Sequence, residues 1–173
     1  MRPTSGKVRE AIFDILGAGV LGARVLDLFA GSGALALEAL SRGARTAVVV
    51  EDHPGALRVL RHNVMHLGLE EQVTVLPVPV RTALRKLQLQ GDDFEVIFLD
   101  PPYDRGLAAQ TLLLLGASTL PATGGIVVAE HSIREELAKE MNRLRLRESR
   151  RYGDTLVSIY LLPDRPDFME SPC

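Results

Sequence analysis

Short apolar segments alternate with helix-like segments along most of the chain, and this alternation restricts the fold more than any other feature. The apolar segments have the length of buried strands and are bounded by Asp, Pro or Gly. Parallel strands need a crossover connection, which a helix usually supplies. The order therefore predicts an α/β fold, a three-layer sandwich whose mostly parallel sheet is covered by helices on both faces.

The expected elements follow from apolar spacing and from the residues that begin and end each segment. The expected strands are residues 24–29, 46–50, 73–77, 94–99 and 125–130. The expected helices are a segment from a Thr4 or Ser5 cap to Gly17 and residues 34–41, 54–67, 82–89, 107–115 and 133–144. Two further strand-like runs, 144–149 and 156–162, are separated by a short turn and predict a C-terminal antiparallel hairpin.

Length and the last residues define the expected domain organisation. A chain of 173 residues fits one domain. We expect that domain at residues 1–162, with an N-terminal helix within residues 1–20. Residues 163–173 carry three prolines and no apolar period, which predicts a loose C-terminal tail.

Composition excludes several classes of protein. The formal net charge is -2 at pH 7, so any contact with nucleic acid must come from a local basic patch. Cys173 is the single cysteine, which rules out an internal disulfide and a zinc site of several thiolates. No apolar run of about 18 residues occurs, and the N-terminus lacks the apolar core of a signal peptide. We therefore expect a cytoplasmic protein that does not bind membranes.

His62 and His66 have the spacing of a metal-binding pair on a helix. No carboxylate or thiol completes a site at similar spacing. We expect a surface or structural role for both residues and no bound metal.

A strand that ends in an acid leads through a glycine turn into a helix. The turn is Gly31-Ser32-Gly33, and Asp27 precedes it. Glycines let the backbone approach a ligand, and the first N–H groups of a helix are free to bind one. A third glycine is absent, which disfavours a dinucleotide. The turn predicts a ligand site, and the alternative is a tight strand-to-helix connection without a ligand.

Glu51 and Asp52 directly follow the second expected strand. In a sheet of this type, a carboxylate at this point lies where a ribose would bind. Glu51 is therefore the candidate acceptor for two ribose hydroxyls. The alternative is a solvated acid at a strand end.

The strongest local motif is Asp100-Pro101-Pro102-Tyr103, at the end of an apolar strand. Two prolines fix the backbone and donate no hydrogen bonds, so the Pro101 carbonyl can remain an acceptor. Asp100 supplies a second acceptor, and Tyr103 supplies a flat stacking face. This set fits the exocyclic amino group of a planar base. The alternative is a rigid loop after a strand.

Five motifs occur together in the order of one bacterial family. They are Arg2-Pro3-Thr4 with Val8-Arg9-Glu10, the turn at 26–33, Glu38-Ala39-Leu40-Ser41-Arg42-Gly43-Ala44, Asp100-Pro101-Pro102-Tyr103, and Tyr152-Gly153-Asp154-Thr155. Through them the chain, up to about residue 162, resembles the S-adenosylmethionine-dependent guanine N2-methyltransferases that modify one guanine of 16S ribosomal RNA. Class I methyltransferases in general share the glycine turn, and amino methyltransferases share the proline motif, so the combination is the specific signal.

The resemblance implies a Rossmann-like class I methyltransferase fold, with a seven-stranded sheet and the cofactor over the carboxyl ends of its first strands. It implies S-adenosylmethionine as the methyl donor and S-adenosylhomocysteine as the product. The implied cofactor residues are Asp27, Phe29, Ala30, Gly31, Ser32, Gly33, Glu51, Asp52 and Arg9. The implied catalytic residues, which hold the reacting base, are Asp100, Pro101, Pro102 and Tyr103.

The resemblance also implies an RNA partner, which is 16S rRNA in the small ribosomal subunit or in an assembly intermediate, bound by a monomer. The N-terminal helix then lies at the substrate and cofactor cleft, where Arg2, Thr4 and Lys7 are candidate RNA contacts. Arg145 and Arg147 belong to the densest basic run, and strand alternation puts them on one face. They can meet phosphates, and an ordinary solvated edge strand is the alternative.

The chain departs from the family pattern in two places. Members usually begin with a Gly- and Arg-rich hairpin ahead of the Arg-Pro-Thr motif, whereas this chain starts at Met1. Methyltransferases commonly carry an Asp or Asn near the end of the third strand, which accepts from the adenine amino group. Pro77, Val78, Pro79 and Val80 stand there instead. We therefore expect a backbone group or packing to hold the adenine.

Two other functions stay open from the motifs. The proline loop serves any planar amide or amine, so an enzyme that methylates DNA adenine or a protein glutamine also fits. A catalytically silent fold that acts as an RNA-binding assembly factor is the other alternative. The flanking motifs favour ribosomal RNA, and the intact Asp27, Glu51, Asp100 and Tyr103 favour an enzyme.

Overall fold

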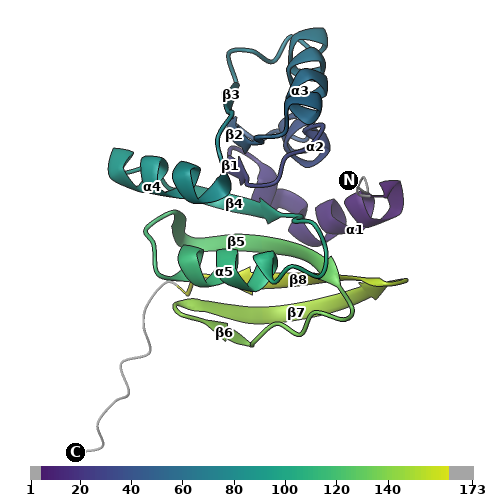
Figure 1. Cartoon of the computed structure of the whole chain (residues 1–173), viewed down its shortest axis with the longest axis vertical. Helices are drawn as coiled ribbons and strands as arrows, with labels where there is room; N and C mark the ends of the chain where they lie inside the picture. Colours follow the sequence, from purple (N-terminus) through teal and green to yellow (C-terminus); the bar gives the residue numbers. More distant parts are fainter. Residues whose placement is uncertain (1–4, 164–173) are drawn as a thin grey trace, which may run out of the picture.

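Eight strands form one mixed sheet in the computed structural model, which describes residues 5–163 (Figure 1). The strands are β1 (Arg24–Asp27), β2 (Thr46–Val50), β3 (Val73–Leu76), β4 (Phe94–Leu99), β5 (Pro121–Ser132), β6 (Glu140–Met141), β7 (Leu144–Tyr152) and β8 (Thr155–Leu161). The helices are α1 (Gly6–Leu16), the 3-10 helix η1 (Gly17–Val20), α2 (Ala34–Ser41), α3 (Pro54–His66), α4 (Val80–Gln90) and α5 (Leu107–Gly116). The strand order is β3-β2-β1-β4-β5-β8-β7-β6.

The first five strands pair in parallel, and the C-terminal strands pair antiparallel. β7 and β8 form a hairpin, and β8 lies between β7 and β5. The predicted mostly parallel sheet with a C-terminal antiparallel hairpin is therefore confirmed. The sheet has eight strands where seven were expected, because the two-residue strand β6 pairs with β7.

Helices cover both faces of the sheet and bury an apolar core on each. One core contains residues of α1, α2 and α3, among them Phe13 and Leu60. The other contains residues of α4 and α5, among them Leu84. Successive residues of a strand point to opposite faces, so Phe98 joins the first core and Ile97 the second. The three predicted layers are present.

Local sequence explains where the helices begin and end. Ser5 caps α1, because its Oγ accepts a hydrogen bond from the N–H of Val8 at 3.2 Å. The other candidate cap, Thr4, lies outside the described residues. Gly91 ends α4 in the left-handed conformation that favours glycine, with φ 76°. Within residues 5–163, no helix has the length and apolar character needed to span a membrane.

The helix expected at residues 133–144 is absent, and this prediction was wrong. β5 continues to Ser132, a connection at 133–139 follows, and β6 and the start of β7 occupy the rest. In the structure Ile133 is exposed, while Met141 and Leu144 enter the core from two neighbouring strands. Helix propensity is a weak preference, and here the contacts with α5 and β8 override it.

The turn between β6 and β7 packs directly on Gly116, the last residue of α5. A Cβ at Gly116 would overlap the carbonyl oxygen of Met141. The backbone N–H and the Nε of Arg143 also donate to the Gly116 carbonyl, at 3.3 Å and 3.2 Å. The close approach requires a residue without a side chain at this position.

Replacing Gly116 with alanine should destabilise the protein, although alanine is the better helix former. The added methyl group overlaps backbone atoms of Met141, and such overpacking costs about 1–3 kcal/mol or more. Gly19→Ala is the matched control, because a Cβ at Gly19 meets nothing within 4 Å. Urea unfolding measures both changes. A Gly116→Ala protein as stable as the wild type would contradict this packing.

Candidate functional site

Three carboxylates come together at the carboxyl ends of neighbouring parallel strands. Asp27 is the last residue of β1, and Glu51 and Asp100 directly follow β2 and β4. The register sets Asp27 beside Val49 of β2 and Phe98 of β4. The order of strands reverses at β1, since β2 lies on one side of it and β4 on the other. Ligands of open α/β sheets bind outside the carboxyl ends at such a point.

Asp27 is the most enclosed of the three. The residue is 1% exposed, and its Oδ1 has no hydrogen-bond partner within the described part of the chain. Burial, with a smaller contribution from the charge of Asp100, raises the pKa of Asp27 to about 7, and the backbone N–H groups of Phe29 and Ala36 oppose the rise. A buried acceptor without a donor costs free energy. The site therefore suits a ligand that brings an N–H donor or a positive charge.

Glu51 links the end of β2 to the glycine turn. Its Oε2 accepts from the N–H of Gly31 at 2.9 Å, and its Oε1 accepts from the N–H of His53 at 2.9 Å. Each carboxylate oxygen can accept more than one hydrogen bond, so Glu51 retains capacity for ligand hydroxyls. Asp52 is exposed beside it. Sequence reasoning missed the bond to Gly31, because it depends on the pairing of β1 with β2.

The glycine turn is held against α3. Gly31 and Gly33 adopt φ values of 56° and 85°, which favour glycine. A Cβ at Gly33 would lie 2.6 Å from Cδ1 of Leu60. The Nδ2 of Asn63 donates to the carbonyl of Ser32 at 3.0 Å. The turn therefore has a fixed backbone conformation with few side-chain atoms, close to Asp27. The contribution of Asn63 was not predicted from the sequence.

The Asp100–Tyr103 segment leaves the end of β4 as a loop. Asp100 is half-buried, Pro101 is buried and Pro102 is exposed. The motif was interpreted as two acceptors and a stacking ring for a planar base, and a rigid loop after a strand was the alternative. The structure places the loop at the carboxyl end of β4, next to the end of β1, and its assignment to a base stays a prediction.

The hydroxyl of Tyr103 ties this loop to the C-terminal strands. It donates to Oε1 of Glu130 at 3.3 Å and lies 2.8 Å from Oγ1 of Thr155, with which it also hydrogen-bonds. Burial raises the pKa of Tyr103, so the hydroxyl stays protonated at neutral pH. Thr155 belongs to the Tyr152-Gly153-Asp154-Thr155 motif. The structure thus gives that motif a role that its sequence did not reveal.

The N-terminal candidates lie on or before α1. Lys7 is exposed and Arg9 is half-buried. Within residues 5–163, neither side chain makes a hydrogen bond or an ion pair. Arg2 and Thr4 lie outside the described residues. The assignments of these residues to RNA and cofactor therefore stay predictions.

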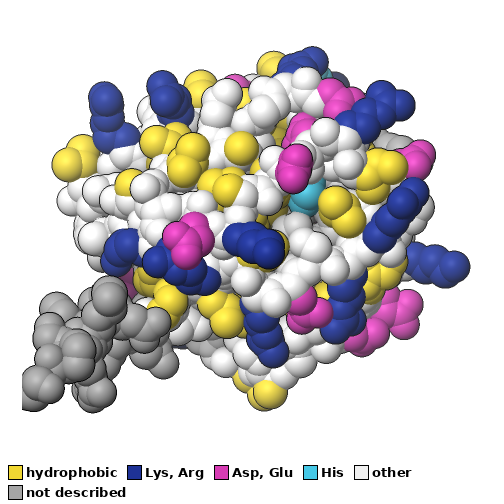
Figure 2. Space-filling model, turned by 90° about the horizontal axis from the view of Figure 1, so that it is seen from below, with side chains coloured by type: hydrophobic (Ala, Val, Ile, Leu, Met, Phe, Trp, Pro, Cys, Tyr) yellow, Lys and Arg dark blue, Asp and Glu magenta, His cyan; other side chains and the backbone are white. Residues whose placement is uncertain are grey.

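The basic run on β7 extends away from the three carboxylates. Tyr152 pairs with Thr155, which in turn pairs with the end of β5, near the carboxyl ends of the parallel strands. Arg145 pairs with Leu161, which lies beside the start of β5. Arg145 and Arg147 therefore lie toward the opposite end of the sheet, at a shallow hollow of about 400 Å³. Figure 2 shows Lys and Arg side chains spread between acidic ones over the face nearest β6 and β7.

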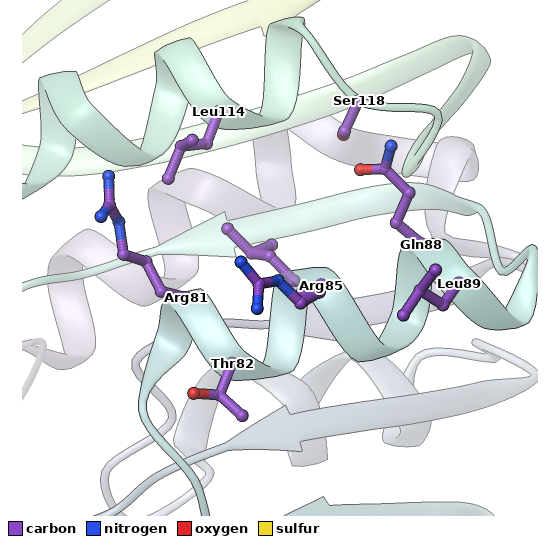
Figure 3. A pocket seen from close by; sticks show the side chains of 8 residues that line it. Arg81, Thr82, Arg85, Gln88, Leu89, Leu114 and Ser118 are labelled. Atoms are coloured by element: carbon purple, nitrogen blue, oxygen red, sulfur yellow. The ribbon is translucent and has the colours of Figure 1, made fainter.

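A larger hollow, of about 620 Å³, lies between α4 and α5 (Figure 3). Its lining residues are Arg81, Thr82, Leu84, Arg85, Gln88, Leu89, Leu114 and Ser118. None of them belongs to the predicted site. The predicted site lies at the carboxyl ends of the strands, where Asp27, Glu51 and Asp100 meet, whereas this hollow lies between two helices of the outer layer.

No metal cluster is formed by the described residues. Within residues 5–163, no group of three His, Cys, Asp or Glu side chains is placed to hold an ion. The rings of His62 and His66 stack with their centroids 5.9 Å apart. The two residues are four positions apart on α3, so their side chains lie on the same face of the helix and their rings stack.

Comparison with known proteins identifies the family of the chain. Residues 1–161 match the family described as Conserved hypothetical protein 95. The chain is 36% identical to the Bacillus subtilis (strain 168) protein "Putative rRNA methyltransferase YlbH", over 92% of this chain and 86% of that one. It is 34% identical to the Escherichia coli (strain K12) protein "Ribosomal RNA small subunit methyltransferase D", over 79% of this chain and 67% of that one.

A solved structure has a similar fold. "Putative methyltransferase yhhF from Escherichia coli" superposes with a TM-score of 0.85 and 28% identity, over 95% of this chain and 90% of that one. The resemblance drawn from the five sequence motifs is thereby confirmed. Since the match spans nearly every residue that the structure describes, the chain belongs to the Conserved hypothetical protein 95 family, whose relatives include proteins named as ribosomal RNA methyltransferases.

Proposed function

We propose that the protein is an S-adenosylmethionine-dependent methyltransferase that methylates the exocyclic N2 amine of one guanine in 16S rRNA. The observation that carries this proposal is the meeting of Asp27, Glu51 and Asp100 at the reversal point of the sheet. The names of the relatives support ribosomal RNA as the substrate class. The choice of the guanine N2 amine rests on the family resemblance and on the chemistry of the Asp100 loop.

The residues present fit S-adenosylmethionine, which supplies an electrophilic methyl group on sulfur and leaves as S-adenosylhomocysteine. Asp27, whose buried Oδ1 lacks a donor within the described residues, suits the charged methionine end. The backbone from Phe29 to Gly33 would lie along the same part of the ligand. Glu51, with Asp52 beside it, would accept from the ribose hydroxyls. Arg9 completes the proposed cofactor set.

Asp100 acts on the reacting amine in this proposal. Its carboxylate and the carbonyl of Pro101 accept the two N–H bonds of the guanine amino group. This holds the amine so that its lone pair faces the methyl group, and placement of this kind is the main contribution of such a site. Pro102 stiffens the loop, and the ring of Tyr103 stacks on the base.

The proposed partner is the small ribosomal subunit or an assembly intermediate of it, bound by a cytoplasmic monomer. Arg2, Thr4 and Lys7 would contact RNA near the cleft. Arg145 and Arg147 would contact phosphates farther along β7. A net charge of -2 means that such local contacts must supply the affinity.

Asp100→Ala should lower the rate of methyl transfer by at least about 100-fold, the scale for a positioned acid or base. Affinity for S-adenosylhomocysteine should stay close to that of the wild type, because Asp100 acts on the base. Tyr103→Ala should instead weaken capture of the base, by about 1–3 kcal/mol of lost stacking. Single-turnover methylation of small subunits and calorimetry measure the two effects. Parallel loss of cofactor affinity and rate in folded Asp100→Ala would contradict this division of roles.

Cofactor affinity should rise with pH between about 5.5 and 7. Asp27 has a pKa of about 7 in the free protein, so it is largely protonated below that pH. The ammonium group of the ligand favours the ionised form, and binding must then displace the proton, which costs up to about tenfold in affinity per pH unit below the pKa. Calorimetry with S-adenosylhomocysteine measures the profile. Asp27→Asn is the control, and it should bind more weakly with a flat profile. An equally steep profile in Asp27→Asn would assign the titration to another group.

Neutralising Arg145 and Arg147 together with glutamine should weaken RNA binding and reduce its dependence on salt. Each lost phosphate contact lowers the slope of log affinity against log salt by about 1. Arg58→Gln with Arg61→Gln is the matched control, since both of those arginines are exposed on α3. Filter binding of small-subunit RNA at several salt concentrations measures the slopes. Equal slopes for the two double variants would leave Arg145 and Arg147 as solvated edge residues.

A further inference from the structure

The connection at residues 133–139, between β5 and β6, reaches the loop that carries Asp100. Within this connection, Glu135 Oε1 accepts a hydrogen bond from the backbone N–H of Asp104 at 2.6 Å. Asp104 directly follows Tyr103. We propose that Glu135 is a positioning residue for methyl transfer, which holds the Asp100–Tyr103 loop in its reacting conformation. This inference rests on the proposed function.

The backbone conformation of Asp104 explains why the loop needs the hydrogen bond to Glu135, which we call the clamp. Its φ is 62°, in the left-handed region, which Asp adopts more often than most residues but which still costs free energy relative to the common conformations. Such a conformation persists only when the surrounding structure enforces it, and it is common next to reactive groups. A carboxylate that accepts from a backbone N–H makes a short, strong hydrogen bond. The Glu135 contact therefore acts at the residue of the loop whose backbone is least favourable by itself.

Hydrogen bonds to Ser132 and His131 fix the backbone of Glu135. Its backbone N–H donates to the carbonyl of Ser132 at 3.0 Å, and the Nδ1 of His131 lies 3.1 Å from the Glu135 carbonyl oxygen. Nδ1 of His131 faces two carbonyl oxygens and must carry the proton, so its Nε2 accepts from the hydroxyl of Ser158 at 2.8 Å. Burial lowers the pKa of His131, which keeps the ring neutral and preserves this arrangement.

Two hydrogen bonds hold the loop, one at Tyr103 and one at the next residue, Asp104. Tyr103 is bound through its hydroxyl to Thr155, and Asp104 is bound through its N–H to Glu135. Thr155 begins β8, which pairs antiparallel with β5, and Glu135 lies in the connection that follows β5. A reactive group must be held within a fraction of an ångström by such supporting contacts. Asp100, with its carboxylate at the reacting base, is the group that benefits.

Three single variants separate a positioning role from a general structural one. Glu135→Ala removes the acceptor, and Glu135→Gln keeps an oxygen that can accept the same N–H. Glu136→Ala changes an exposed neighbour whose side chain makes no hydrogen bond or ion pair within residues 5–163. We expect single-turnover methylation by Glu135→Ala to be slower by about 10- to 100-fold, the scale for a misplaced reactive group. Glu135→Gln and Glu136→Ala should methylate at close to the wild-type rate.

Two further measurements exclude a trivial loss of folding or of cofactor binding. Glu135→Ala should be fully folded at the assay temperature, and its affinity for S-adenosylhomocysteine should match that of Glu136→Ala. A rate for Glu135→Ala equal to that of Glu136→Ala would overturn the proposal. So would a fall in rate matched by a fall in cofactor affinity or in folded fraction, or an equal fall in Glu135→Gln.

Amide hydrogen exchange tests the clamp independently of any enzymatic activity. The N–H of Asp104 should exchange faster in Glu135→Ala than in Glu136→Ala, because its acceptor is gone, while amides of the β5–β8 pairing should not change. Unchanged exchange at Asp104 would overturn the clamp itself. If the wild type methylated no ribosomal substrate while the exchange result held, the proposed function would fail and the clamp would stand.

Discussion

β1 lies between β2 and β4, and the place of each candidate reactive group depends on this pairing. Asp27, Glu51 and Asp100 are far apart in the chain and meet because three strands end at one edge of the sheet. The bond between Glu51 and Gly31 then joins the second strand to the turn after the first. The same crowding buries Asp27 and raises its pKa. The site therefore contains an unfavourable charge environment that a cationic ligand relieves.

The sequence was a good guide to the features that depend on a few neighbouring residues. The turn at Gly31 and Gly33 and the loop after Asp100 were found because glycine and proline have backbone effects that do not need a fold to be recognised. The alternation of segments predicted the layers and the parallel sheet. These features predicted the edge at which Asp27 and Asp100 meet.

Contacts between distant segments could not be predicted in this way. The hydrogen bonds from Tyr103 to Thr155 and from Asp104 to Glu135 each join the Asp100–Tyr103 loop to strands or connections near the C-terminus. The connection that contains Glu135 was expected to be a helix, since its residues favour one. Its real conformation is set by β5, which continues to Ser132, and by the packing of Met141 on α5. The helix propensity of these residues does not predict the continuation of β5 or the packing of Met141 on α5.

The outer edge of β7 has a consequence for the behaviour of the protein at high concentration. β7 has nine residues, but β6 pairs with only Leu144 and Arg145, so most of its edge has no neighbouring strand among the described residues. A long open edge invites pairing with another molecule, and charged side chains or a bulge prevent it. β7 has both, since Arg145, Arg147, Arg150 and Arg151 lie along it and the register shifts between Leu146 and Glu148. The arginines and the register shift therefore disfavour extension of the sheet by a strand of a second molecule.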